Sequence, residues 1–70
     1  MSIEIVVREI GRRQKREIRL SRRAAVVDLL KQLGQNREMV VVRINGKIVA
    51  EEEHLKDGDV VEIIPIVTGG

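Results

Sequence analysis

The residues with the clearest chemical potential are the last three of the 70-residue sequence, Thr68-Gly69-Gly70. Glycine has no side chain and adopts backbone angles closed to other residues, so Gly69 and Gly70 could enter a narrow channel and present the Gly70 carboxylate to another protein's active site. A carboxylate is a poor electrophile until adenylation gives it a good leaving group. Alone, a terminal Gly-Gly is a weak signal, because small residues occur at chain ends by chance.

The other reactive side chains do not predict a catalytic or metal site. Cysteine is absent, which excludes a thiol nucleophile, a thiolate metal site and a disulfide, and which fits a reducing cytoplasm. His54 is the single histidine, and because neighbouring side chains point in different directions, His54 beside residues 51–53 predicts a solvated surface loop rather than metal ligands. With hydroxyls only at Ser2, Ser21 and Thr68 in so small a domain, we expect neither an enzyme nor a bound cofactor.

Charge is divided between the two halves of the chain. Residues 1–37 carry ten Lys/Arg against four Asp/Glu, and residues 38–70 carry three against seven. The basic segment from Arg12 to Arg23 could contact phosphates, as an RNA-binding module would. Phe, Tyr and Trp are all absent, which removes base-stacking platforms, so a solvated face or a surface for an acidic partner is the preferred interpretation. No apolar run approaches the ~20 residues that span a bilayer, so we expect no membrane association and a cytoplasmic location.

The first half of the chain predicts a hairpin and a helix. Alternating apolar residues predict strands over about residues 2–9 and 15–20, joined by a turn at Gly11. Ser21 is expected to cap the following helix, and Gly34 is expected to end it in a left-handed conformation. The apolar residues of that helix recur on one face, at Val26, Leu29, Leu30 and Leu33.

The second half predicts three more strands in one sheet. Residues 39–44 and 47–49 flank Asn45-Gly46, which favours a type I′ turn. Asp57-Gly58-Asp59 is a turn signal before a last strand over residues 60–66. The fold class is therefore α+β, with a mixed sheet of four to five strands and one amphipathic helix packed across one face. Residues 1–66 should form the domain, and residues 67–70 a flexible tail.

The last strand is apolar on both sides. If Val61 and Ile63 face the helix, alternation leaves Val60, Ile64 and Ile66 on the opposite side, which is unusual for a sheet covered on one face. Either long neighbouring side chains shield these residues, or they form a docking patch for a partner protein. Pro65 lacks an N–H, so we expect it to loosen the chain from the sheet before Val67.

Two segments together resemble one protein family. Residues 43–49, Arg-Ile-Asn-Gly-Lys-Ile-Val, and residues 55–70, from Leu-Lys-Asp-Gly-Asp to Val-Thr-Gly-Gly, are similar to the ThiS/MoaD family of ubiquitin-like β-grasp sulfur carriers. These proteins are thiamine-pathway sulfur carriers and small subunits of molybdopterin synthase. The resemblance implies a β-grasp fold and a cycle in which the terminal glycine is adenylated and then converted to a thiocarboxylate.

The resemblance also implies roles and partners. Gly70 would be the modified residue, with Gly69 and Thr68 as the tail. Docking is assigned less firmly to Val60, Ile64 and Ile66. The implied partners are a ubiquitin-activating-like adenylating enzyme that uses ATP and Mg²⁺, a sulfurtransferase or other sulfur donor, and a thiazole synthase or the large subunit of molybdopterin synthase.

One departure leaves the pathway open. Many thiamine-pathway carriers have a Pro-Arg pair and an aromatic residue after the second hairpin, whereas this chain continues from Val49 into residues 50–54, Ala-Glu-Glu-Glu-His. Sulfur donation to the thiamine thiazole is the first expectation, and donation to molybdopterin the second. A protein modifier joined to lysines through Gly70 remains an alternative that the sequence does not separate from a carrier.

Overall fold

The structure, a computed structural model of the chain, describes residues 1–11 and 14–66. The described residues form five strands, one α-helix and one short 3₁₀ helix. In chain order these are β1 Ser2–Glu9, β2 Lys15–Ser21, α1 Val26–Leu33, η1 Arg37–Met39, β3 Val40–Ile44, β4 Lys47–Val49 and β5 Val60–Pro65.

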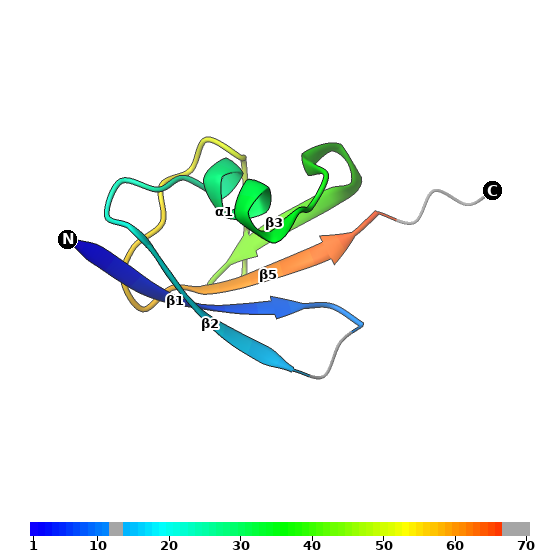
Figure 1. The fold of residues 1–70 in the computed structure, drawn as a ribbon. Coiled ribbons are helices and arrows are strands. Elements are labelled where there is room, and N and C mark those ends of the chain that lie inside the picture. The colour runs from blue at the N-terminus through cyan, green and yellow to red at the C-terminus, as the bar shows by residue number, and fades with distance from the viewer. Residues whose placement is uncertain (12–13, 67–70) are drawn as a thin grey trace.

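The strands make one mixed sheet in the order β2-β1-β5-β3-β4. The two hairpins, β1–β2 and β3–β4, are antiparallel as expected, and β5 joins them by pairing in parallel with β1 and antiparallel with β3. Helix α1 lies across one face of this sheet (Figure 1). The predicted α+β architecture is therefore confirmed, with five strands.

An aliphatic core lies between the sheet and α1. Alternation along β1 directs Ile3, Ile5 and Val7 inward, and Val61 and Ile63 of β5 lie beside them. The predicted apolar face of the helix is also confirmed, because Val26, Leu29 and Leu30 are buried and Leu33 packs against them. With a hydrophobic layer on only one side, the opposite face of the sheet is left to solvent or to partners.

The predicted start of the helix is wrong. Ser21 is the last residue of β2, and its hydroxyl oxygen accepts a 3.4 Å hydrogen bond from the Arg23 N–H rather than from a helical N–H. The helix begins at Val26, after the N-cap residue Ala25. Ala25 has no side-chain oxygen, and instead its own N–H donates to Oδ2 of Asp28 at 2.9 Å. A carboxylate in the first helical turn also interacts favourably with the helix dipole.

The other boundaries shift by a residue or two. Gly34 does end α1 in the left-handed conformation, with φ 72°. Met39 was predicted in a strand but belongs to η1, which starts because the Asn36 side chain accepts a hydrogen bond from the Glu38 N–H at 3.0 Å. Strand β5 stops at Pro65, yet the Ile66 N–H donates to the Met39 carbonyl oxygen at 2.8 Å.

Ile66 is therefore still hydrogen-bonded to Met39, and the chain is not loosened at Pro65 as predicted. The predicted tail, residues 67–70, lies outside the described residues, so the division at residue 66 stays a prediction. Among the residues that are described, no helix is long and apolar enough to cross a membrane.

Candidate functional site

Strand β5 carries apolar side chains on the face of the sheet away from α1, here called the outer face. Val61 and Ile63 are buried under the helix, at 0% and 2% exposure. Val60 and Ile66 face the other way and are 39% and 42% exposed, while Ile64 is half-buried. The predicted outward placement of Val60, Ile64 and Ile66 is confirmed, although their docking role is not tested by position alone.

Neighbouring strands extend this apolar surface. The register places Val6 of β1 beside Val60, and Val41 of β3 beside Ile64. Ile48 lies opposite Arg43 on the edge strand β4 and is 73% exposed. These additional members escaped the sequence analysis because cross-strand neighbours depend on strand order. Only Ile48 could be found from local sequence, because in a strand whose Val49 faces the core the adjacent Ile48 faces outward.

An ion pair stands in the middle of the outer face. Glu62 of β5 is only 14% exposed, and its Oε1 accepts a 2.8 Å hydrogen bond from Nε of Arg43 on β3. On the other side, Nη1 of Arg8 on β1 lies 3.9 Å from Glu62 Oε2. One carboxylate thus lies between two guanidinium groups, which leaves a net positive charge surrounded by aliphatic side chains.

The same contacts alter the proton affinities. The hydrogen bond from Arg43, and then the charges of Arg43 and Arg8, lower the pKa of Glu62 and outweigh the opposing effect of desolvation. The hydrogen bond to Glu62 and the charge of that carboxylate raise the pKa of Arg43. Both groups are therefore held in their ionised forms at neutral pH.

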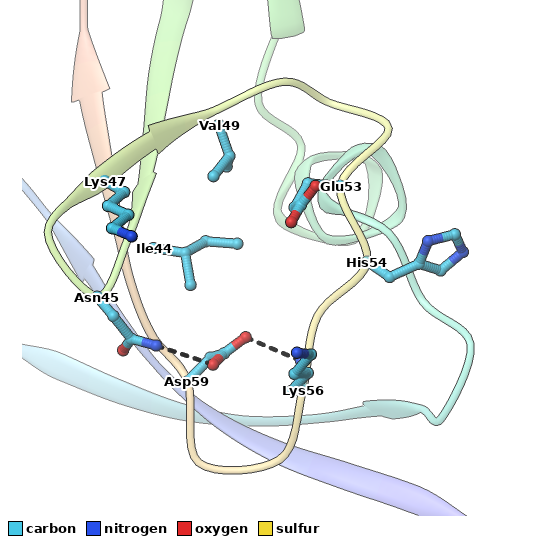
Figure 2. A pocket seen from close by; sticks show the side chains of 8 residues that line it. All are labelled: Ile44, Asn45, Lys47, Val49, Glu53, His54, Lys56 and Asp59. Atoms are coloured by element: carbon cyan, nitrogen blue, oxygen red, sulfur yellow. Dashed lines mark hydrogen bonds between the residues drawn. The ribbon is translucent and has the colours of Figure 1, made fainter.

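A second set of contacts fixes the point where β5 begins. Asn45 and Gly46 both have positive φ, at 49° and 87°, as the predicted Asn-Gly turn requires. Asp59 is buried: its Oδ1 accepts from Nδ2 of Asn45 at 3.0 Å, and its Oδ2 accepts from the Lys56 N–H at 2.8 Å (Figure 2). The side-chain oxygen of Asn45 in turn accepts from the Val60 N–H at 3.0 Å.

These bonds among Asn45, Lys56, Asp59 and Val60, here called the clamp, tie two turns together at one end of the sheet. The predicted role of Asp57-Gly58-Asp59, a turn that starts the last strand, is confirmed, with Gly58 at φ 85°. Because Val60 is the first outward residue of β5, the clamp also sets which residues of β5 face outward. The Asn-Gly and Asp-Gly-Asp motifs thus position the outer face.

A shallow pocket of about 260 Å³ borders this clamp. Figure 2 shows Lys47 and Glu53 directed into it, over the aliphatic side chains of Ile44 and Val49, whereas the imidazole of His54 points away. His54 is exposed on a loop, as predicted. Within residues 1–11 and 14–66, no group of three or more His, Asp or Glu side chains is placed to hold a metal ion.

The remaining predicted site residues are Thr68, Gly69 and Gly70, which lie outside the described residues. The structure does describe the segment that precedes them, which is the end of β5 and Ile66. Ile66 is held to Met39 by the bond described above, and the side chains of both residues are substantially exposed. The tail sequence thus follows directly from the end of the outer face.

The chain resembles known proteins in both sequence and structure. The sequence model of the ThiS family matches residues 6–70. A Pyrococcus furiosus protein assigned as molybdopterin converting factor, subunit 1, has a similar structure, with a TM-score of 0.80 and 28% sequence identity over 94% of this chain and 100% of that one.

Two more distant structures share the fold alone. The HVO 2177 protein of Haloferax volcanii has a TM-score of 0.77 at 23% identity, over 99% of this chain and 88% of that one. The ubiquitin of Caldiarchaeum subterraneum has a TM-score of 0.74 at 16% identity, with both chains covered completely. The fold is thus the ubiquitin-like β-grasp, as the sequence predicts.

Proposed function

The chain belongs to the ThiS family, and from that premise we propose that it is a sulfur carrier protein whose working group is the carboxylate of Gly70. In this role the protein is a co-substrate, and its partner enzymes supply the catalytic groups. The outer face binds those partners through Val60, Ile64 and Ile66, while Thr68 and Gly69 form the narrow tail that brings Gly70 to their active sites.

The chemistry proceeds in two steps on the Gly70 carboxylate, the first at the α-phosphorus of ATP and the second at the carboxyl carbon. A carboxylate oxygen attacks the α-phosphorus of ATP in a ubiquitin-activating-like enzyme, with Mg²⁺ on the phosphates, and pyrophosphate leaves. Sulfide, or the terminal sulfur of a persulfide on a sulfurtransferase, then attacks the carboxyl carbon and AMP leaves. With a persulfide donor, the product is an acyl disulfide, and a second thiol on the partner forms a disulfide with the donor sulfur and releases the thiocarboxylate. The final product is a thiocarboxylate, in which one oxygen of Gly70 has become a nucleophilic sulfur atom.

The observation that supports this proposal is the continuity between β5 and the tail sequence. The family match runs through Gly69 and Gly70, and the strand that leads to them presents apolar side chains away from the core. In protein interfaces aliphatic side chains give affinity and fixed charges give orientation, and the outer face provides both. A partner complementary to this patch would have an apolar surface and a carboxylate that pairs with Arg8.

We place the recipient of the sulfur in cofactor biosynthesis. The family match favours a thiazole synthase of the thiamine pathway. The similarity to the Pyrococcus furiosus protein favours the large subunit of molybdopterin synthase as the second candidate.

Intact mass spectrometry of the full chain, isolated with an unblocked C-terminus from cells that retain their activating enzyme, tests the proposal. We expect a species in which one oxygen is replaced by sulfur, and its absence from a variant lacking Gly70. If deletion of Gly70 left that species unchanged, the carrier proposal would be wrong. Lysine conjugates through Gly70 would instead identify a protein modifier, and salt-sensitive RNA retention with an unmodified tail would identify an RNA-binding module.

A further inference from the structure

Strand β2 forms one edge of the sheet and, among the described residues, pairs with β1 alone. The Val6 N–H donates to the Asp59 carbonyl and the Glu4 carbonyl accepts from the Gly58 N–H, so the main chains of Val6 and Glu4 are directed away from β2. In an antiparallel pair, the residues opposite such positions also direct their N–H and C=O groups outward.

The register identifies these outward groups. Glu17 lies opposite Val6, and Arg19 lies opposite Glu4. Both residues therefore present a main-chain donor and acceptor at the open edge, spaced two residues apart as an added strand requires. Their side chains, with that of Lys15, lie on the outer side, while Arg16, Ile18 and Leu20 lie on the side of the helix.

The charge along this edge favours one kind of partner. Residues 15–23 carry five Lys/Arg against the single acidic residue Glu17, and all six charged residues are exposed. Arg19 is engaged by Glu4, with its Nη2 2.6 Å from Glu4 Oε1, which leaves the other cations facing solvent or partner. Basic side chains on an edge strand oppose pairing between two copies of the same chain and attract an acidic strand.

A groove beside the edge can hold the side chains of such a strand. Its volume is about 380 Å³, and it lies between the end of β2 and helix α1. Leu20 and Ala24 supply an aliphatic surface, and Arg23 supplies a cation. The other lining residues are Ser21, Asp28 and Gln32. An extended peptide on β2 would direct alternate side chains toward this groove.

We propose that the β2 edge is a second docking surface, which binds an extended acidic segment of a partner protein as an additional strand. The main chains of Glu17 and Arg19 bind the peptide backbone, Lys15 and Arg16 bind its carboxylates, and the groove receives an aliphatic side chain. Strand β1 separates this edge from β5, so the added strand leaves Ile66 uncovered. One partner could thus hold the protein while another engages its outer face.

Titration of the ¹⁵N-labelled full chain with an eight-residue peptide of glutamates around one central valine, which carries carboxylates on both sides of the strand, tests this surface. We expect chemical-shift changes and slower amide hydrogen exchange at Glu17 and Arg19, with little change at Val60 and Ile64. A peptide with lysine in place of glutamate should not bind. Equal binding of both peptides, shifts confined to the outer face, or no binding at roughly millimolar peptide would overturn the proposal.

The main-chain contribution is tested by a matched pair of variants. Glu17→Pro removes an N–H at the open edge without removing a bond to β1, and Glu17→Ala keeps that N–H. We expect about tenfold weaker peptide binding for Glu17→Pro and no weakening for Glu17→Ala. If Glu17→Pro does not fold, Arg16→Glu provides the test, because it should also weaken binding.

Unchanged affinity in Glu17→Pro, or in Arg16→Glu where Glu17→Pro does not fold, would contradict the proposal. A further arm uses an oligouridylate in place of the peptide. If the RNA shifted the amides of residues 15–23 and the acidic peptide did not, the edge would be a nucleic-acid surface and the proposal would be wrong.

Discussion

Asp59 and Asn45, 14 positions apart in the sequence, hold two turns of the sheet together through a 3.0 Å hydrogen bond between their side chains. Asp59 also accepts from the Lys56 N–H, and Asn45 also accepts from the Val60 N–H. In the described part of the chain, no buried side-chain nitrogen or oxygen atom is left without a hydrogen-bond partner. The two side chains therefore act as a unit, and loss of their contact should destabilise both turns.

Asp59→Ala should lower the free energy of unfolding by about 1–3 kcal/mol, because it leaves the Asn45 amide and the Lys56 N–H without their acceptor. Urea unfolding at neutral pH measures this change. Glu52→Ala, an exposed substitution in the preceding loop, is the control and should stay within about 0.5 kcal/mol of the parent. Equal effects of the two substitutions would show that the clamp contributes nothing specific.

Ile66→Asp should slow adenylation of the protein by its activating enzyme about tenfold, because it places a charge in the apolar docking surface. Gln32→Asp is the control, since it introduces the same charge at an exposed position of α1, away from the outer face. Pyrophosphate release at limiting protein concentration measures the rate, and thermal unfolding checks that both variants fold. A similar loss of rate in both variants would contradict the proposal that the activating enzyme docks on the outer face.

The stabilising effect of Glu62 should depend on pH in a defined direction. Its pKa is lowered in the folded protein, chiefly by the hydrogen bond from Arg43, so its contribution is fully present above the ordinary carboxyl pKa of about 4.3. The contribution should be lost as the pH falls further, through the lowered pKa of the folded state. Unfolding curves of the parent and of Glu62→Gln, measured from pH 7 to pH 3, should therefore converge in acid; a constant difference would contradict the assignment.

Gly34→Ala should cost about 1–2 kcal/mol of stability through backbone strain alone. The residue has φ 72°, and a Cβ atom added there would meet no other atom within 4 Å, so a clash makes no contribution. Chemical denaturation measures the cost, with Gln32→Ala on the exposed side of α1 as the control. No loss in Gly34→Ala would mean that the helix can end in another conformation.

Local sequence patterns predicted the faces of the elements better than their ends. Alternation along β5 placed Val60 and Ile64 outward, and helical spacing placed Val26 and Leu29 in the core. Neither period fixes where an element begins, so the sequence pattern predicts the wrong cap, Ser21. The true start depends on Asp28, whose carboxylate binds the Ala25 N–H from within the helix.

Contacts between strands could not be predicted in the same way. Glu62 lies between Arg8 and Arg43 because β5 inserts between β1 and β3. That insertion pairs residues of β1 and β5 that are more than fifty positions apart in the sequence. No local pattern of Arg and Glu residues predicts this pairing. The ion pair and the extra apolar residues of the outer face therefore needed the strand order.

The parallel pairing of β1 with β5 has a consequence for the timing of folding. On the ribosome the β1–β2 hairpin emerges first, but the second edge of β1 has no partner until β5, at residues 60–65, has been made. Contacts of such long range close late and slow the folding of a small domain. A product that stopped before residue 60 would lack β5, and it would leave one edge of β1 unpaired and the core residues Ile5 and Val7 exposed.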